Sequence, residues 1–374
     1  MVLAAFVAAA APGAAGRIPN WAAPQIATVV SHQLMGAKSV RTFKPNVTLK
    51  QQTLADLALG LQQELGSPAP PSLSPDPSST TTTSTYPTYT TTTTSTTTTP
   101  TSAPTVADPA GQVSMAQLDR QLVYSLGLQQ ASKEFAAGAR AAGAAVPGRF
   151  GTEVVSRLLG LRINHPAAQD FLELRPQDPA TRAEAAYSAA QILNFGYLSD
   201  SWQVEQAQSL ADSFELPQLN DWQRRILSVA FSKVGMPYIW GGTSDGPETE
   251  FGVSSRGGYD CSGFVWRVYK LQSYPNEGSL ASTIKGRTTY TMSVEVPRSK
   301  RIPFTKLQPA DVVFFGTNGS HSKGPQIFHT GIYVGNGWFI QSSDYGVALA
   351  QLSGWYEKRF AWGRRPLAEA GLEP

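Results

Sequence analysis

A single cysteine, Cys261, is the feature that most restricts what this 374-residue chain can build. One thiol cannot form an intrachain disulfide, and it cannot furnish a cysteine-rich zinc site or an iron–sulfur cluster. The chain has only four histidines, which leaves little for a histidine-rich metal site. Hydrophobic residues make up 41% of the sequence, enough for ordinary buried cores. We therefore expect a packed protein with no metal and no cofactor.

The charge pattern gives no sign of a nucleic-acid partner. Residues 1–220 carry 13 basic and 15 acidic side chains, and the remainder carries 17 and 12. The mildly basic second half is compatible with a neighbouring anionic polymer, but it fits a solvated surface of mixed sign better. It lacks the dense stripe of Lys and Arg that nucleic-acid binding requires. We expect no nucleic acid among the partners.

The first 17 residues contain an apolar run, Val2–Ala11, followed by small residues. The run is too short to cross a bilayer, which takes about 20 apolar residues, so no membrane span is expected. It has the look of a secretory signal that lacks the usual basic start. Residues 1–17 are therefore either a signal segment, which would make the protein secreted, or an alanine-rich lead-in.

A Thr/Ser-rich tract, Ser78–Ser102, lies inside the segment 67–112, which we interpret as a linker. Such a composition cannot bury enough apolar surface to offset chain entropy, so a disordered tether is expected. Ser/Thr tracts with proline are also typical of O-glycosylated stalks. Whether a glycosylated stalk or an unmodified spacer, the tract favours an extracellular protein.

Three helix-like runs, which begin near Val47, Val113 and Ala180, form a weak internal repeat. Each run opens with a Ser or Thr that could cap a helix. Short helix–loop–helix units of this kind stack because none can bury its apolar face alone. The repeat predicts an all-α module built from residues 18–66, 113–148 and 149–198, with residues 199–221 as a connector.

This module resembles the S-layer homology (SLH) family, on the strength of Pro19-Asn20-Trp21-Ala22 and of Thr181-Arg182-Ala183-Glu184. Only the third copy keeps the second tetrapeptide. The resemblance implies a pseudo-trimer that grips an anionic secondary cell-wall polymer, with Arg182 as the matched binding residue. The alternative is a degenerate helical module that merely positions its neighbour, since a fold alone does not confer function.

The chemistry is expected further along the chain. Asp221–Val234 has the apolar periodicity of a helix, and Asp260 is a good N-cap for a second helix whose first turn holds Cys261. A lone cysteine is usually an inert buried hydrophobe. At a helix start, however, the partial positive charge favours the thiolate, and the free amides can donate to an oxyanion.

A cysteine nucleophile also needs a base and a group that orients it. Strands are predicted at 311–315, 329–334 and 338–343, the last two joined as a hairpin. A two-residue loop would turn Gln341 away from His329, whereas a three-residue, bulged loop would place Gln341 opposite Gly331 and on the face of His329. His321 is a competing base and Asp344 a competing orienting residue, and both fit the triad geometry less well.

Taken together, these segments resemble the NlpC-type family of cell-wall cysteine peptidases over about residues 222–370. Four motifs carry the resemblance in order: 235–242 (GMPYIWGG), 260–264 (DCSGF), 310–315 (ADVVFF) and 329–333 (HTGIY). Ala310 stands where the family usually has Gly, and Thr330 where it usually has Val. The implied fold class is α+β, papain-like, with helices packed on an antiparallel sheet.

The resemblance also implies the activity, which is cleavage of peptidoglycan stem peptides, commonly between D-glutamate and a diamino acid. Cys261 would be the nucleophile, His329 the general base and then acid, and Gln341 the third polar residue. Tyr238, Asp260 and Ser262 would bind substrate. We thus expect a secreted cysteine endopeptidase held at the cell wall by its SLH-like module. The rivals are an amidase or acyltransferase on the same fold, and a wall-binding structural protein whose catalytic domain is vestigial.

Overall fold

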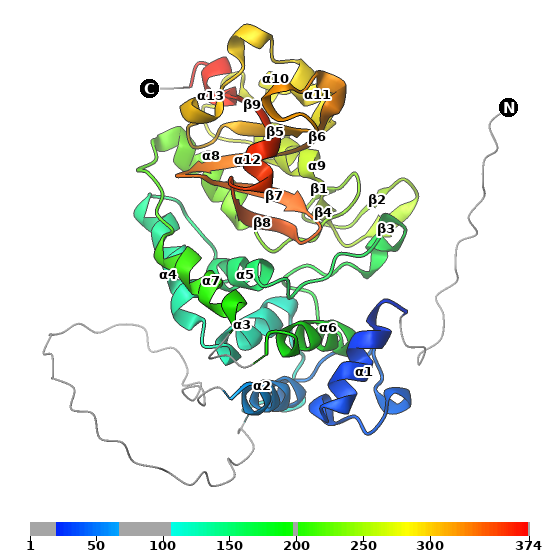
Figure 1. Cartoon of the computed structure of the whole chain (residues 1–374). Helices are drawn as coiled ribbons and strands as arrows, with labels where there is room; N and C mark the ends of the chain where they lie inside the picture. Colours follow the sequence, from blue (N-terminus) through cyan, green and yellow to red (C-terminus); the bar gives the residue numbers. More distant parts are fainter. Residues whose placement is uncertain (1–19, 67–105, 197–200, 373–374) are drawn as a thin grey trace, which may run out of the picture.

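The computed structural model describes residues 20–66, 106–196 and 201–372 (Figure 1). The expected signal or lead-in segment and the Thr/Ser tract lie outside these residues. A helical part occupies the lower half of Figure 1, and a domain built on a β-sheet occupies the upper half. Within the described residues, no helix is both long and apolar enough to cross a membrane.

The helical part is assembled from seven α-helices within the described residues. Short 3-10 turns connect them, among them η4 (Ala167–Leu172). The last helix lies in the segment expected to be a plain connector, so that segment is partly helical. The seven helices are α1 (Ala23–Ser31), α2 (Gln51–Leu65), α3 (Met115–Ser125), α4 (Gln129–Ala141), α5 (Phe150–Leu158), α6 (Arg182–Leu193) and α7 (Trp202–Asp212).

The three repeated runs meet at their starts. Leu49 donates its backbone N–H to the carbonyl of Ala180 at 2.8 Å, Val113 donates to Leu49 at 3.2 Å, and Ala180 donates to Val113 at 2.8 Å. These bonds close a ring in which each run serves as donor once and as acceptor once. Helices α2, α3 and α6 start within two residues of it. The repeat is thus a pseudo-threefold arrangement in space.

The prediction that a Ser or Thr caps each of these three helices is correct for two of them. Ser114 caps α3 and Thr181 caps α6 through their hydroxyls. The expectation of a Ser or Thr cap is wrong for α2, where Lys50 occupies the N-cap position and makes no side-chain cap bond. The physical reason is the position of Thr48, which lies two residues before the N-cap and is therefore too early in the chain to cap the helix.

The upper domain has one five-stranded sheet in the order β8-β7-β6-β5-β9, and every neighbouring pair is antiparallel. The predicted strands and the predicted helix near residue 221 are confirmed. Helices α8 (Asp221–Ser232) and α9 (Cys261–Trp266) accompany the sheet. The strands are β5 (Val312–Gly316), β6 (Ile327–Gly335), β7 (Trp338–Ser343), β8 (Gly346–Gln351) and β9 (Phe360–Arg364).

The hairpin between β6 and β7 combines the two alternatives considered from the sequence. Its loop is the short one, because Gly335 pairs with Trp338. A bulge between Tyr333 and Gly335 then shifts the register by one residue, so that Gln341 pairs with Gly331. The extra residue lies in the strand rather than in the loop. The inference that this register requires a three-residue loop is therefore wrong, but the register that places Gln341 opposite Gly331, on the face of His329, is confirmed.

The helical part and the sheet domain share one continuous hydrophobic core. Phe214, just after α7, packs its ring 5.1 Å from Phe135 of α4 and 5.3 Å from Trp338 of β7, centre to centre. A buried ion pair within α5, Arg157 with Glu153 at 3.2 Å, adds a polar contact. Arg157 donates from Nη2 to the carbonyl of Gly235 at 2.5 Å, directly ahead of the segment that enters the candidate site.

Candidate active site

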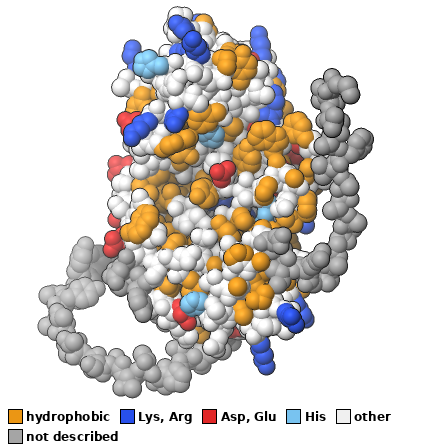
Figure 2. Space-filling model, turned by 45° about the vertical axis from the view of Figure 1, so that its right-hand side comes forward, with side chains coloured by type: hydrophobic (Ala, Val, Ile, Leu, Met, Phe, Trp, Pro, Cys, Tyr) orange, Lys and Arg blue, Asp and Glu red, His pale blue; other side chains and the backbone are white. Residues whose placement is uncertain are grey.

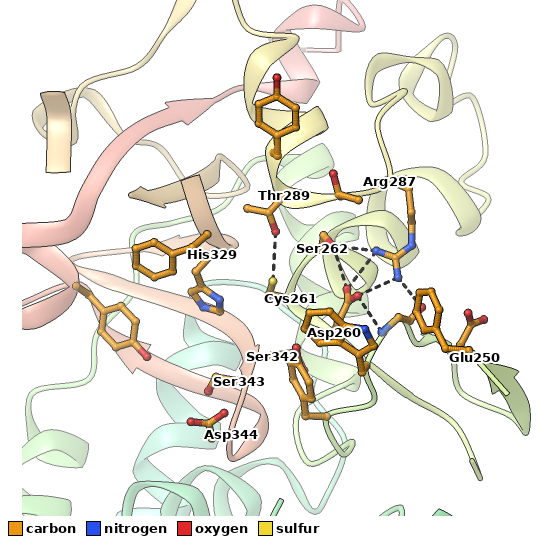
Figure 3. A pocket seen from close by; sticks show the side chains of 18 of the residues that line it. Glu250, Asp260, Cys261, Ser262, Arg287, Thr289, His329, Ser342, Ser343 and Asp344 are labelled. Carbon is orange, nitrogen blue, oxygen red and sulfur yellow. Dashed lines mark hydrogen bonds and ion pairs between the residues drawn. The ribbon is translucent and has the colours of Figure 1, made fainter. Parts of the chain in front are cut away.

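The start of α9 is fixed by an extensive polar network. Asp260 caps the helix, since its Oδ1 accepts from the amide of Gly263 at 2.5 Å. Arg287 donates to Asp260 Oδ1 at 3.1 Å, to Ser262 Oγ at 2.8 Å and to the carbonyl of Gly241 at 2.6 Å (Figure 3). Charge-assisted bonds of this type are stronger than neutral ones. Arg287 therefore ties the helix start to the 235–242 segment.

Cys261 is the first residue of α9, as predicted, and its thiol lies 3.3 Å from Thr289 Oγ1 (Figure 3). Burial, and secondarily the charge of Asp260, raise the pKa of Cys261 to about 11. The bond to Thr289 and the backbone amides of Ser262 and Thr330 act in the opposite direction. The expectation that the helix start would favour the thiolate is thus not met, because desolvation outweighs the helix amides.

His329 on β6 lies beside Gln341 on β7, and the distance from Nε2 to Oε1 is 2.5 Å. Gln341 Nε2 in turn donates to Tyr356 Oη at 2.6 Å. A carbonyl oxygen only accepts, so this arrangement requires the imidazole proton to be on Nε2. Nδ1 is left as the acceptor, and Figure 3 shows the ring beside Cys261.

Burial also governs the charge of the imidazole. It lowers the pKa of His329 to about 4, although the bond to Gln341 and the charge of Asp344 act to raise it. A high thiol pKa and a low imidazole pKa leave both groups neutral near pH 7. The resting cleft therefore holds a thiol and a neutral imidazole rather than an ion pair.

Cys261 and His329 line one cleft of about 630 Å³. The predicted residues Tyr238, Asp260 and Ser262 line it too, whereas Gln341 is buried behind His329 with 4% of its surface exposed. The competing residue Asp344 lines the cleft, and His321 is an exposed residue of another loop. The aromatic walls comprise Tyr238, Trp240, Phe251, Tyr290, Phe328, Trp355 and Tyr356.

Three residues of this site were missed from the sequence: Arg287, Thr289 and Tyr356. The available signal was the pair Thr288 and Thr291, which form a capping box and so mark a helix start, α11 (Thr289–Val294). That pattern predicts a helix but says nothing of what the helix approaches. Tyr356 lies in a five-residue helix, α12 (Trp355–Arg359), whose position depends on the sheet.

The helical part supports one wall of the cleft. Asp170 of η4 accepts from the backbone amide of Trp240 at 3.0 Å. The strand β3 (Val253–Ser255), whose hairpin with β2 (Glu248–Glu250) carries Phe251, packs against η4. The side with β2 and β3 turns forward in Figure 2, where hydrophobic side chains spread over the middle of the face. The cleft wall is thus held by both parts of the chain.

Comparison with known proteins gives the family of the upper domain. Residues 235–365 match the model of the NlpC/P60 family. The C-terminal domain is an NlpC/P60 domain. The papain-like α+β fold with helices on an antiparallel sheet, expected from the sequence, is confirmed. These comparisons do not confirm the SLH character of the helical part.

The chain is similar to murein DD-endopeptidase MepH of Escherichia coli, at 31% identity over 49% of the chain and 60% of the relative. It is also similar to the probable peptidoglycan endopeptidase LytE of Bacillus subtilis, at 33% identity over 36% of the chain and 31% of the relative. Among solved structures, the P60 domain of a Mycobacterium avium subspecies paratuberculosis antigen matches 38% of this chain and 93% of that one, at 22% identity and TM-score 0.29. The chain therefore spans 60% or less of these two curated relatives.

The helical part has a pocket of its own, of about 440 Å³, next to the ring of repeated runs. Arg182 lines it with Lys38, Lys44 and Lys50. The guanidinium of Arg182 lies 4.6 Å from the ring centre of Phe43 and donates to the carbonyls of Phe43 and Met35 at 2.8 and 3.0 Å. Arg182, which the sequence predicted to bind the polymer, is the predicted site residue that lines this pocket.

Proposed function

We propose that the NlpC/P60 domain hydrolyses an amide bond in the stem peptides of peptidoglycan with Cys261 as nucleophile. The observation that carries the proposal is the pairing of His329 with Gln341 in the cleft that also holds the thiol. This pairing leaves Nδ1 unprotonated in an imidazole that lines the same cleft as the sulfur. The names of similar proteins, a murein endopeptidase and a peptidoglycan endopeptidase, support the substrate class.

In the proposed mechanism, His329 Nδ1 takes the thiol proton as the sulfur attacks the amide carbon, so no stable thiolate has to form beforehand. The protonated imidazole then donates that proton to the leaving amine. Water, activated by the same imidazole, hydrolyses the thioester and restores the thiol. Gln341 holds the tautomer through a neutral hydrogen bond, and it cannot neutralise the imidazolium as a carboxylate could.

The bond that we propose is the one between D-glutamate and the diamino acid. The similar proteins include a DD-endopeptidase and a DL-endopeptidase by name, so the bond is a separate question from the substrate. Mass spectrometry of digested muropeptides answers it, because the proposed cleavage frees the amino terminus of the diamino acid. Release of the whole stem from the sugar would identify an amidase instead, and transfer to an added amine an acyltransferase.

A vestigial domain is the remaining alternative. It predicts binding to sacculi without hydrolysis under any reducing condition. Hydrolysis by the intact chain, lost in Cys261→Ala, would exclude it. Since the variant removes only the sulfur of a residue at a capped helix start, we expect the fold to survive.

For the helical part we propose wall anchoring at the pocket of Arg182, in a secreted protein. The support is the pseudo-threefold ring of repeated runs together with four cationic side chains around one pocket. An anionic cell-wall polymer fits that charge. The test is binding to sacculi that retain or lack the polymer, for the intact chain and for Lys38→Ala/Arg182→Ala. Lys133→Ala, an exposed charge on α4, is the control. Equal binding by all three would favour a module that only positions its neighbour.

A further inference from the structure

A second groove, of about 430 Å³, lies between α5, α6 and α7 and the turn that joins β7 to β8. Three aromatic side chains from three separate elements line it: Tyr187, Trp202 and Tyr345. Trp202 is 63% exposed and Tyr345 50% exposed, so a large part of each ring is open to solvent. Such exposure of large aromatic side chains around a hollow is typical of a binding surface.

The remaining lining groups are mostly neutral. Gln191, Gln203 and Gln206 supply side-chain amides, which both donate and accept hydrogen bonds. Within the described part of the chain, the amides of Gln191 and Gln206 make no side-chain hydrogen bond. The charged lining residue there is Arg157, whose guanidinium is already occupied by Glu153 and by the carbonyl of Gly235. The groove thus offers no free cation to an anionic polymer.

Aromatic faces combined with neutral amides suit a carbohydrate. The C–H faces of a pyranose ring pack on aromatic rings, and its hydroxyl and acetamido groups exchange hydrogen bonds with side-chain amides. A phosphate or a carboxylate would instead need cations, as in the pocket of Arg182. The chemistry of the groove therefore favours a neutral N-acetylated sugar.

The groove and the catalytic cleft meet at one tight turn. Ser343 pairs with Gly346, so Asp344 and Tyr345 form the two-residue loop between β7 and β8. Asp344 lines the catalytic cleft, and the next residue, Tyr345, lines the groove. Gly160, just after the end of α5, lies beside Tyr345, since a Cβ on that glycine would be 3.9 Å from Tyr345 Cε1, an ordinary van der Waals distance. A ligand that follows the turn can therefore occupy both sites.

We propose that this groove binds an N-acetylated hexosamine of the glycan strand to which the stem peptide in the cleft is attached. The inference rests on the proposed function, because it assumes that a stem peptide occupies the cleft. Stem peptides begin on a sugar, and each extended residue spans about 3.3–3.6 Å. Only a few residues separate the sugar from the scissile bond. The sugar therefore lies next to the cleft, at a separation comparable to the width of the β7–β8 turn.

The kinetic test compares two substrates of identical peptide sequence, one still attached to its disaccharide and one released from it. We expect Trp202→Ala and Tyr345→Ala each to raise KM for the sugar-linked substrate on the order of tenfold, the effect of losing one aromatic contact. KM for the free peptide and kcat for both substrates stay at the level of the unaltered chain. Phe304→Ala removes an exposed aromatic residue of the sheet domain that lines neither site, and serves as the control. Equal changes for both substrates would overturn the proposal.

A binding test separates this inference from the proposed function. Peptide-free glycan strands are titrated into the full chain carrying Cys261→Ala, and the heat of binding is measured by calorimetry. We expect saturable binding that is lost when Trp202→Ala is added and kept when Phe304→Ala is added. No binding to the glycan, with normal cleavage of both substrates, would refute the groove and leave the proposed function standing. Saturable binding with no cleavage by the unaltered chain would refute the function alone.

Discussion

His329 Nε2 and Gln341 Oε1 lie 2.5 Å apart across neighbouring strands, and this contact exists because of a bulge. Without the extra residue between Tyr333 and Gly335, every residue of β7 up to Gln341 would face the other side of the sheet. The bulge thus sets the tautomer of the imidazole. An irregularity of one residue in a hairpin decides which nitrogen can accept the thiol proton.

Replacement of Gln341 by Ala is expected to lower kcat about fivefold, the effect of losing one neutral hydrogen bond of roughly 1 kcal/mol. His329→Ala removes the base and is expected to cost on the order of 10²–10⁴-fold. Tyr356→Phe, which removes only the partner of Gln341, should cost less than Gln341→Ala. Measuring kcat of the three variants on one muropeptide gives the order of these losses. Complete inactivity of a folded Gln341→Ala would mean that the orienting bond is as essential as the base.

The protonation state of the Cys261 thiol can be measured by its rate of alkylation with iodoacetamide, a reagent that carries no charge. Because the pKa of Cys261 is raised to about 11, the thiolate fraction is small at pH 7 and grows about tenfold per pH unit. We therefore expect the alkylation rate to rise steadily from pH 7 to 10 without a plateau. The unfolded chain should level off above about pH 8.5, the ordinary pKa of cysteine. A plateau below pH 7 in the folded chain would indicate a thiolate–imidazolium pair instead.

Asp260→Asn tests the contribution of charge to the thiol pKa. The carboxylate of Asp260 raises the pKa of Cys261, so its removal should lower that pKa. Asparagine is also a good N-cap, which keeps the helix start. We expect faster alkylation at pH 7.5, on the order of tenfold, with the rise of rate displaced to lower pH. An unchanged profile would show that burial alone sets the pKa.

The buried pair of Arg157 and Glu153 should dominate the stability of the junction between the two parts. Arg157→Ala leaves the Glu153 carboxylate buried and unpaired, and is expected to lower the free energy of unfolding by about 3–5 kcal/mol. Arg224→Ala, in an exposed pair with Asp221, should change it by less than about 1 kcal/mol. Urea unfolding of both variants at pH 8 checks the difference.

The same pair gives a pH dependence of known sign. Burial raises the pKa of Glu153 from 4.5 to about 7 even with Arg157 present, and without the arginine it should rise further. The folded state of Arg157→Ala then binds a proton that the unfolded state releases, so its stability increases as the pH falls from 8 toward 4.5. The loss relative to the unaltered chain should be smaller at pH 5 than at pH 8. A loss that grows toward pH 5 would contradict this account of the pair.

The local parts of the site could be read from the sequence because their causes are local. A cap at Asp260 places Cys261 at a helix start whatever surrounds it, and short apolar and aromatic runs bounded by turn residues give β5, β6 and β7. The register of Gln341 could be posed as two alternatives. The choice depended on where the extra residue was accommodated, which the Gly335–Gly337 turn signal alone does not determine.

The remaining features depend on contacts between distant segments. Thr289 reaches the thiol, and Arg287 reaches Asp260, only after α11 has packed beside β6. The raised pKa of Cys261 arises from burial, which no spacing of residues reveals. The contact of Asp170 with Trp240 joins residues 70 positions apart, on two parts that the sequence suggested were separate.

The central claim is that Cys261 cleaves the stem peptide, and digestion of purified muropeptides tests it most directly. The intact chain and its Cys261→Ala variant are incubated under reducing conditions, and the products are analysed by mass spectrometry. We predict fragments with a free diamino-acid terminus from the intact chain and none from the variant. Equal products from both, or none from the intact chain, would contradict the account.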